Sequence, residues 1–265
     1  MGVRLAVAVV LIPMVLLTLY LGPLWLWILL LEVFLVSALW EFFRLLDRYS
    51  LGGFEITAVA TAVSPIVWAV FRPYLPVFLL AVPVLLLARS FWQGTAEGRL
   101  LPRAGANIFC FFYLGIPFSL PILLRESEGA TGQGQELVFV LLCVWLSDSA
   151  GFLVGRKIGR HKVTPGISPN KSLEGFAAAL IAPCLGAVLL HPLLLSGQPS
   201  VPAAILGGLM GGAAIAGDLF ESFLKRRAGI KDSSALIPGH GGVLDRMDSL
   251  LFALPCYYFL ERVLA

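Results

Sequence analysis

The sequence predicts an all-α polytopic membrane protein with about nine transmembrane helices and a cytoplasmic N-terminus. Two observations carry this prediction. Hydrophobic residues make up 58% of the 265 residues and charged residues only 13%, whereas soluble domains carry roughly 25% charged residues. Apolar runs of about twenty residues recur along the whole chain, and each is long enough to cross a hydrocarbon core of roughly 30 Å as a helix.

The apolar runs predict the spans in chain order. They cover residues 4–21, 24–45, 54–71, 74–92, 104–124, 135–155, 172–191, 200–226 and 243–262. Pro65 and Pro183 lie inside spans, and membrane helices tolerate such kinks. Trp25 and Trp92 fall near predicted ends, as expected of an aromatic belt at the membrane surface.

The positions of Lys and Arg orient these helices. With the N-terminus in the cytoplasm, all of the 19 Lys and Arg residues except Arg72, Arg125 and Arg262 fall in cytoplasmic segments. Because cytoplasmic loops are enriched in positive charge, this asymmetry predicts a cytoplasmic N-terminus and a C-terminus on the other side. Two charged stretches, 148–175 and 217–250, then lie on the cytoplasmic face, where they can meet.

The stretch 217–250 concentrates acids and bases in an otherwise apolar chain. Asp245 and Asp248 are three residues apart, so they share one helix face, and Asp218 and Glu221 repeat this spacing near the end of the preceding helix. Carboxylate oxygens are the ligands that Mg²⁺ prefers, and these four acids are the predicted metal ligands. The alternative is that they only pair with nearby bases, which are Lys225, Arg226, Arg227 and Arg246.

The segment 237–243, Ile-Pro-Gly-His-Gly-Gly-Val, predicts a tight turn ahead of the last helix. Its glycines permit positive φ and close backbone approach. The amides of Gly241 and Gly242 would then be available to phosphate at a helix N-terminus. A plain connecting turn is the alternative, and His240 would either bind phosphate or cap the loop.

Acidic residues also occur inside predicted spans. Asp148 lies deep in the sixth span, and an intramembrane acid suggests a functional site. Glu32 lies in the middle of the second span, where we expect a functional or inter-helix role. Glu41, near the cytoplasmic end of that span, is expected to pair with Arg44.

The segment 168–172, Ser-Pro-Asn-Lys-Ser, predicts a stiff turn into the seventh helix. Ser172 or Asn170 would cap the helix, with Glu174 in its first turn. The turn would hold Lys171 in a defined place for binding phosphate. The basic residues Arg160 and Lys162 are explained by topology and attraction to lipid headgroups.

Two blocks of this chain resemble the phosphatidate cytidylyltransferase family, also called CDP-diacylglycerol synthases. One block contains Ser222-Phe-Leu-Lys-Arg, Lys231-Asp232, Pro238-Gly-His-Gly-Gly and Asp245-Arg-Met-Asp248. The other runs from Asp148-Ser through Gly155-Arg and Ser168-Pro-Asn-Lys-Ser to Glu174-Gly. A departure is Ala150-Gly151-Phe152, where the family usually has Gly-Ala-Tyr.

The resemblance implies that CTP and phosphatidate are converted to CDP-diacylglycerol and pyrophosphate, by in-line attack of the lipid phosphate on the α-phosphorus. It also implies that Asp218, Asp245 and Asp248 bind Mg²⁺ and that a second cation, such as K⁺, shares the site. The residues expected to neutralise the triphosphate and the leaving group are Lys225, Arg226, Lys231 and Arg246. The residues expected to bind substrate are Asp148, Ser168, Asn170, Lys171, Ser222, His240, Gly241 and Gly242.

By this interpretation residues 1–265 form one domain, in which 1–134 are mostly scaffold helices and 135–265 carry the catalytic helices and loops. The expected location is the inner (plasma) membrane, with the site facing the cytoplasm. The resemblance further implies a homodimer, and no nucleic-acid partner is expected.

Two alternatives remain. A CTP-dependent polyprenol or lipid kinase would also have membrane helices and use CTP and Mg²⁺, but the attack would be on the γ-phosphorus. A transporter would use Asp148, Asp218 and Glu32 as ion ligands, and it would distribute charges along a path through the membrane.

Overall fold

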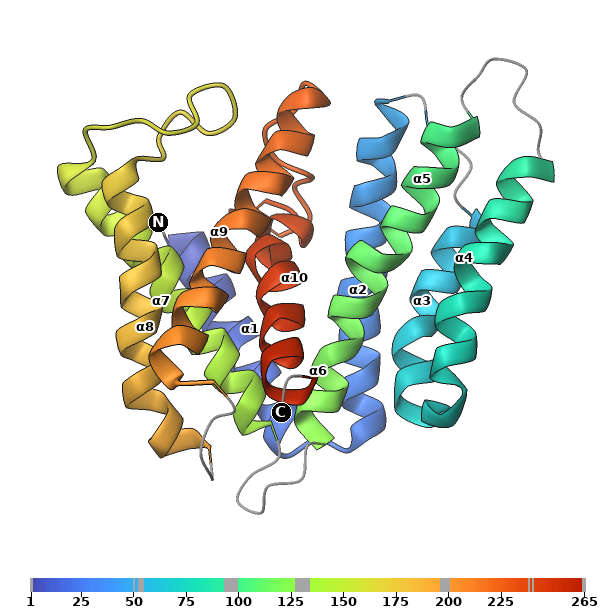
Figure 1. The fold of residues 1–265 in the computed structure, drawn as a ribbon, viewed down its shortest axis with the longest axis horizontal. Helices are drawn as coiled ribbons and strands as arrows, with labels where there is room; N and C mark the ends of the chain where they lie inside the picture. The colour runs from blue at the N-terminus through green and yellow to red at the C-terminus, as the bar shows by residue number, and fades with distance from the viewer. Residues whose placement is uncertain are drawn as a thin grey trace. The chain divides into compact units, whose positions relative to one another are not determined.

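The computed structural model of the chain describes residues 2–49, 51, 55–92, 100–126, 134–195, 201–237, 239 and 241–263. Every regular element in these ranges is helical (Figure 1). The β-type pairing found in the described ranges consists of isolated bridges, Lys162 with Ser172 and Ile237 with Gly241. The predicted all-α class is therefore confirmed.

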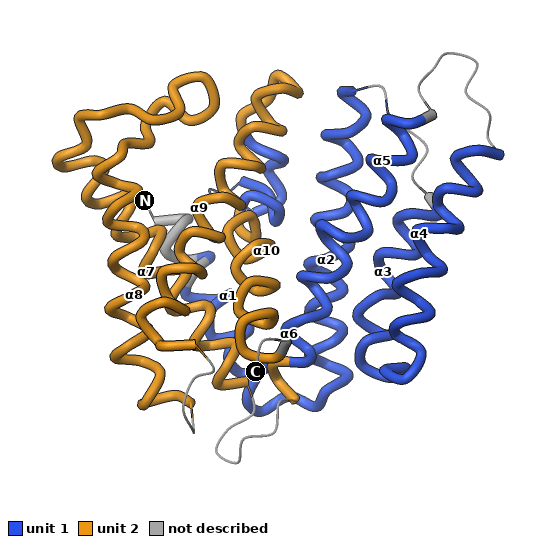
Figure 2. Tube along the Cα trace, viewed as in Figure 1, with its two compact units in different colours: residues 1–123, 232–245 blue, residues 124–231, 246–265 orange. Residues whose placement is uncertain are grey.

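The chain divides into two compact units (Figure 2). The first unit comprises Met1–Leu123 and Asp232–Asp245, and the second comprises Leu124–Lys231 and Arg246–Ala265. The segment 232–245, which contains the glycine turn, thus belongs with the N-terminal helices. The prediction of one domain with a scaffold half and a catalytic half stays a prediction.

The first unit is built from the N-terminal helices. These are α1 (Gly2–Tyr20), α2 (Leu24–Asp47), α3 (Glu55–Val70), the 3-10 turn η1 (Arg72–Tyr74), α4 (Leu75–Trp92) and α5 (Leu100–Cys110). A π-helical turn, Phe111–Gly115, continues α5 directly into α6 (Ile116–Glu126), whose last residues belong to the second unit. This continuous helical segment, which includes the apolar span Leu101–Glu126, agrees with the single span predicted for 104–124.

The second unit contains the helices that carry most of the predicted site. These are α7 (Gln135–Ile158), α8 (Leu173–Leu194) and α9 (Ala203–Arg227), followed by the larger part of α10 (Leu244–Tyr258) and a π turn at Phe259–Val263. Helix α10 begins with Leu244 and Asp245, which belong to the first unit.

The described helices are those of a multi-pass membrane protein. Six helical segments are long and apolar enough to cross a membrane, and they are Leu24–Asp47, Arg72–Trp92, Leu101–Glu126, Gln135–Ile158, Leu173–Leu194 and Ala203–Arg227. Val9–Tyr20 and Ile56–Val70 are apolar but shorter. The count of nine spans and the orientation of the N-terminus stay predictions.

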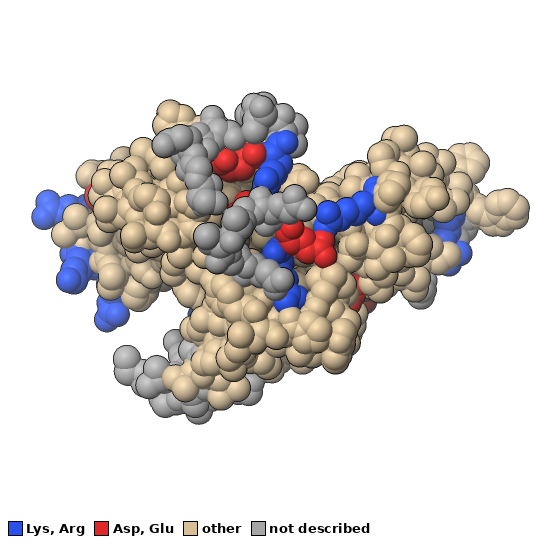
Figure 3. Space-filling view, turned by 90° about the horizontal axis from the view of Figure 1, so that it is seen from below, with Lys and Arg blue, Asp and Glu red and all other residues tan. Residues whose placement is uncertain are grey.

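Large apolar side chains on these helices face outward. Leu80 is 73% exposed and Leu193 is 77% exposed, which is the arrangement expected of surfaces that contact lipid acyl chains. The face shown in Figure 3 is mostly uncharged, with Lys, Arg, Asp and Glu in small separate areas.

A buried polar network joins three helices of the first unit. Thr57 on α3 donates to Asn107 Oδ1 on α5 at 2.7 Å, and Asn107 Nδ2 donates to Ser90 Oγ on α4 at 3.3 Å. All three side chains are buried. Because lipid offers no hydrogen-bond partner, such groups favour association of the helices that satisfy them.

Small residues bring the helices of the second unit close together. A Cβ at Gly207 of α9 would lie 2.1 Å from the carbonyl oxygen of Pro183 on α8, so only glycine permits this approach. Ser147 on α7 donates to the carbonyl oxygen of Ala179 on α8 at 2.8 Å. These contacts hold α7, α8 and α9 around the site described below.

We expect Asn107→Ala to lower the free energy of unfolding by about 1 kcal/mol, because it removes both hydrogen bonds that link α5 to α3 and α4. Thermal unfolding in detergent micelles measures this. Ser37→Ala is the matched control, since the hydrogen bond that Ser37 makes in the described part of the chain lies within its own helix, to the carbonyl oxygen of Val33. Equal melting temperatures for the two variants would contradict the role of the network.

Candidate functional site

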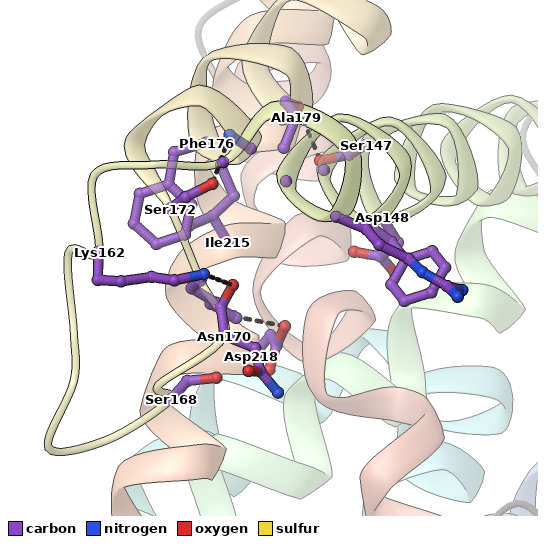
Figure 4. Close-up of a pocket in the computed structure, with 17 residues that line it drawn as sticks. Ser147, Asp148, Lys162, Ser168, Asn170, Ser172, Phe176, Ala179, Ile215 and Asp218 are labelled. Carbon is purple, nitrogen blue, oxygen red and sulfur yellow. Dashed lines mark hydrogen bonds and ion pairs between the residues drawn. The ribbon is translucent and has the colours of Figure 1, made fainter.

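A cavity of about 670 Å³ lies within the second unit (Figure 4). Its walls come from α7, the loop 159–172, the start of α8 and α9. The polar residues that line it are Ser147, Asp148, Arg156, Lys162, Ser168, Asn170, Lys171, Ser172 and Asp218. Phe152, Phe176 and Ile215 add an apolar part to the lining. The cavity therefore offers cations, carboxylates and apolar surface together.

The loop 159–172 is held at both of its ends. Val163 N donates to the carbonyl oxygen of Lys171 at 3.3 Å, and Leu173 N donates to that of His161 at 2.8 Å. Ser172 caps α8 by accepting a hydrogen bond from Gly175 N at 3.2 Å. This confirms the predicted cap and the predicted turn, so Lys171 has a defined place at the start of α8.

A second contact between the loop and α8 involves His161 and Glu174. His161 Nδ1 lies 2.7 Å from Glu174 Oε1, and the backbone amide of His161 also donates to this carboxylate. The sequence had identified Glu174 only as a first-turn acid. Its thirteen-residue separation from His161 leaves no local signal for the pair.

Lys171 and Asp218 form an ion pair at the cavity, with Nζ 2.6 Å from Oδ2. Asp218 Oδ1 also accepts a hydrogen bond from Ser222 Oγ at 3.4 Å. Figure 4 shows Ser168 and Asn170 beside Asp218. Five of the predicted site residues, from the turn and from α9, are therefore brought together.

Lys162 has a larger place in the site than the sequence indicated. It lines the cavity, and its Nζ donates to the carbonyl oxygen of Asn170 at 3.2 Å. Attraction to lipid headgroups had seemed sufficient to explain this residue. The bridge between Lys162 and Ser172 aligns it with the turn, and this pairing could not be seen in the sequence.

Asp148 and Asp248 lie near Asp218 within the second unit, close enough for their charges to interact. Ser249 Oγ donates to Asp148 Oδ1 at 3.4 Å, and Ser249 N donates to Asp248 Oδ1 at 2.7 Å. Of these three predicted acids, Asp148 on α7 and Asp218 on α9 line the cavity, and Asp248 on α10 lies near both of them.

The other predicted site residues near the end of α9 have partners inside the protein. Glu221 is buried and forms an ion pair with Lys225 at 2.9 Å, and it also lies close to Asp248. Arg226 Nε donates to the carbonyl oxygen of Ile167 in the loop at 3.3 Å. The pairing of Glu221 with Lys225 is the alternative that the sequence left open for this acid. Arg226 instead ties α9 to the loop.

Asp245, the last residue of the segment 232–245, is hydrogen-bonded by other residues of that segment. The Oδ2 atom of Asp245 accepts hydrogen bonds from Ser233 N at 3.0 Å, from Ser233 Oγ at 2.9 Å and from Gly242 N at 2.8 Å. Gly239 and Gly241 have positive φ, of 76° and 87°, which confirms the predicted tight turn.

Two further predicted site residues, Lys231 and Arg246, are exposed. The predicted residue His240 lies outside the described residues.

The expected pairing of Glu41 with Arg44 is wrong. The Arg44 guanidinium lies over the Trp40 ring, 4.7 Å from its centroid. Glu41 instead accepts hydrogen bonds from the segment 232–245, including one from Ser233 at 2.9 Å. The error arose because a neighbour four residues away is visible in the sequence, whereas a partner 192 residues away is not.

The acids of the second unit fit Mg²⁺ by their chemistry. No three His, Cys, Asp or Glu side chains of the described residues are grouped so that they could hold a metal ion alone. Mg²⁺ in phosphate-handling sites is usually held by one or two carboxylates together with substrate phosphates and waters. Asp218 and Asp248 are donors of this kind, so they suit a metal that binds with a substrate.

Gly159→Ala tests how the loop is seated. A Cβ there would lie 2.2 Å from the carbonyl oxygen of Gly155 and 2.4 Å from Ser172 Oγ, so we expect a loss of about 2 kcal/mol in the free energy of unfolding and faster protease cleavage of the loop. Gly166→Ala is the control in the same loop, because a Cβ there meets nothing within 4 Å. Similar melting and cleavage of the two variants would refute this view of the loop.

The chain matches the cytidylyltransferase family over residues 2–264. It is 40% identical over 166 residues to a phosphatidate cytidylyltransferase of Haemophilus influenzae, covering 59% of this chain and 57% of the relative. It is 35% identical over 150 residues to one of Bacillus subtilis, covering 56% and 54%. An uncharacterized protein of Escherichia coli, YnbB, is 36% identical over 141 residues, covering 53% and 47%.

The chain spans about half the length of the curated relatives that it matches. The family model, in contrast, matches nearly all of it. The resemblance found in the two charged blocks is thereby confirmed at the level of the family. This chain belongs to the cytidylyltransferase family.

Proposed function

We propose that this protein transfers the cytidylyl group of CTP to phosphatidate, giving CDP-diacylglycerol and pyrophosphate. The observation that carries the proposal is the cavity of the second unit, which is lined by the cations Lys162 and Lys171 and the acids Asp148 and Asp218. Cations suit the phosphates of both substrates, and carboxylates suit a divalent metal bound to a triphosphate. Membership of the cytidylyltransferase family supports transfer of a nucleotide.

The lining of the cavity favours a lipid as the acceptor. Phe152 lines it and is 63% exposed, and Phe176 and Ile215 add further apolar surface. A headgroup phosphate can contact Lys171 and Asn170 while the first carbons of the acyl chains contact this apolar part. Phosphatidate cytidylyltransferases among the relatives point to the same acceptor.

In the proposed reaction, an ionised oxygen of the phosphatidate phosphate forms a bond to the α-phosphorus of CTP. The bond from that phosphorus to the α,β-bridging oxygen breaks, and this oxygen keeps the electron pair as pyrophosphate leaves. The nucleophile is already ionised at neutral pH, so no side chain has to remove a proton from it. Positioning and charge neutralisation are the tasks left to the protein.

We assign these tasks to residues of the stretches 148–175 and 217–250. Lys171, with Ser168 and Asn170, binds phosphate, and incoming phosphate oxygens offer its ammonium a second partner besides Asp218. The residues proposed to hold Mg²⁺ are Asp218, Glu221, Asp245 and Asp248. When bound, Mg²⁺ would supply positive charge that neutralises the CTP phosphates. Lys225, Arg226, Lys231 and Arg246 supply further positive charge around them.

We place the cavity on the cytoplasmic side of the inner membrane. The positive charge of the loop 159–172 and of the end of α9 supports this orientation, because positively charged segments are retained in the cytoplasm. CTP is available on that side. Homodimer formation and a second cation such as K⁺ stay predictions from the family resemblance.

The proposed activity predicts where each phosphorus of CTP is found after the reaction. With phosphatidate in mixed micelles and CTP labelled at the α-phosphorus, we expect label in the lipid extract and release of pyrophosphate in equal amount. CTP labelled at the γ-phosphorus should leave the lipid unlabelled. Transfer of γ-label to lipid would identify a lipid kinase instead. Solute flux in proteoliposomes without either product would identify a transporter.

Asp218→Asn tests the proposed metal ligands. We expect turnover to fall by about 100-fold, because the variant loses a negative charge that should hold the metal and align Lys171. Mn²⁺ titration followed by electron paramagnetic resonance, with CTP present, should show weaker metal binding. Asp47→Asn, at the exposed end of α2, is the matched control and should leave turnover and Mn²⁺ binding unchanged. Unaltered Mn²⁺ affinity in Asp218→Asn would exclude Asp218 as a ligand.

A further inference from the structure

We propose that Glu41 is a positioning residue, which fixes the segment 232–245 and the start of α10 so that Asp245 keeps one orientation. The role in turnover rests on the proposed function, whereas the structural role does not. Glu41 lies on α2 and is completely buried, with 0% of its surface exposed. A buried carboxylate is tolerated only when several donors satisfy it, so its partners identify its role.

Among the described residues, the hydrogen bonds to the Glu41 carboxylate come from one distant segment. Ser233 Oγ and Ser234 Oγ donate to it at 2.9 and 2.5 Å, and the amides of Val243 and Leu244 donate at 2.9 and 2.7 Å. Each carboxylate oxygen accepts one hydroxyl and one amide. Ser233 and Ser234 lie at one end of the segment, and Val243 and Leu244 lie at the other. The carboxylate therefore holds the two ends of the segment together.

The start of α10 requires an acceptor from elsewhere. The first amides of a helix have no partner within the helix, and a Ser, Thr, Asn or Asp just before the helix normally supplies one. Val243 holds this place before Leu244 and has no acceptor in its side chain. Glu41 supplies both the acceptor and a negative charge that the N-terminal end of the helix dipole favours.

Ser233 connects Glu41 to Asp245. Its hydroxyl lies 2.9 Å from Glu41 Oε2 and 2.9 Å from Asp245 Oδ2. A hydroxyl has one proton to donate, so it can donate to one of the two carboxylates at a time. The Ser233 amide and the Gly242 amide also donate to Asp245. The orientation of Asp245 therefore depends on a serine that Glu41 holds in place.

Gly242 provides the space for this arrangement. A Cβ at this position would lie 1.9 Å from Ser233 Oγ and 2.5 and 2.6 Å from the two carboxylate oxygens of Glu41. Any side chain would therefore displace the carboxylate. The second glycine of the Gly-Gly pair is thus required by Glu41, whether or not its amide also meets a phosphate.

The test compares Glu41→Gln with wild type by hydrogen exchange and by turnover. The glutamine keeps the size of the side chain, but its amide group points N–H donors at the donors of the segment. We expect the amides of Val243 and Leu244 to exchange at least about tenfold faster, with no change in α8. We also expect kcat for CDP-diacylglycerol formation to fall at least about tenfold, with KM for CTP changed less than kcat.

Asp47→Asn is the matched control, an acid-to-amide change on the same helix at an exposed position, and it should alter neither measurement. Unchanged exchange in Glu41→Gln would overturn the proposal. Faster exchange with unchanged kcat would overturn the positioning role. If wild-type protein forms no CDP-diacylglycerol, the proposed function fails, and the exchange result still decides whether Glu41 holds the segment.

Ser233→Ala separates the two parts of the proposal and covers the case in which Glu41→Gln does not fold. It removes the hydroxyl between the carboxylates and leaves the acceptor for α10 in place. We expect a kcat lower than that of wild type, whereas the amides of Val243 and Leu244 should exchange as slowly as in wild type. A wild-type kcat in this variant would contradict the link from Glu41 through Ser233 to Asp245.

Discussion

An acid on an apolar helix is stabilised by hydrogen-bond donors inside the protein, because lipid offers none. Much of this structure reflects that stabilisation. Glu41 binds two hydroxyls and two amides, Asp218 binds Lys171, and Glu136 at the start of α7 binds Arg262 at the end of the chain at 2.5 Å. Each of these contacts joins stretches that are far apart in the sequence. The acids therefore determine which segments meet, as well as what chemistry is available there.

Charged groups of the cavity in the second unit are held by a short loop that is fixed to the neighbouring helix. This loop begins at Gly159 and ends at the cap of α8, and His161 and Glu174 hold it against the helix. The ammonium of Lys171 therefore reaches the cavity from a backbone that is already ordered. Preorganised charges of this kind are effective toward phosphates because no reorganisation is required when the substrate arrives.

The sequence predicted what local patterns determine. The apolar runs located the helices to within a few residues, as for α7, predicted at 135–155 and found at Gln135–Ile158. Ser172 and the glycine turn were identified because capping and positive φ depend on neighbouring residues. The partners of Glu41 and His161 were missed, since hydrogen bonds between distant residues depend on packing that no local pattern encodes. The approach of Asp218 and Asp248 was predicted from their helical spacing, whereas Asp148 was expected nearby only because the stretches 148–175 and 217–250 can meet.

The segment 232–245 returns the chain to its N-terminal helices after α9 has ended. Its hydroxyls and amides use the carboxylate of a residue translated some two hundred positions earlier. A polypeptide beginning at residue 135 would lack that carboxylate and leave four donors without it. The N-terminal helices are therefore more than a membrane anchor that another anchor could replace. Recombination or gene splitting between the two halves would have to preserve Glu41 together with the serines and Gly242, so these distant positions are constrained to change together.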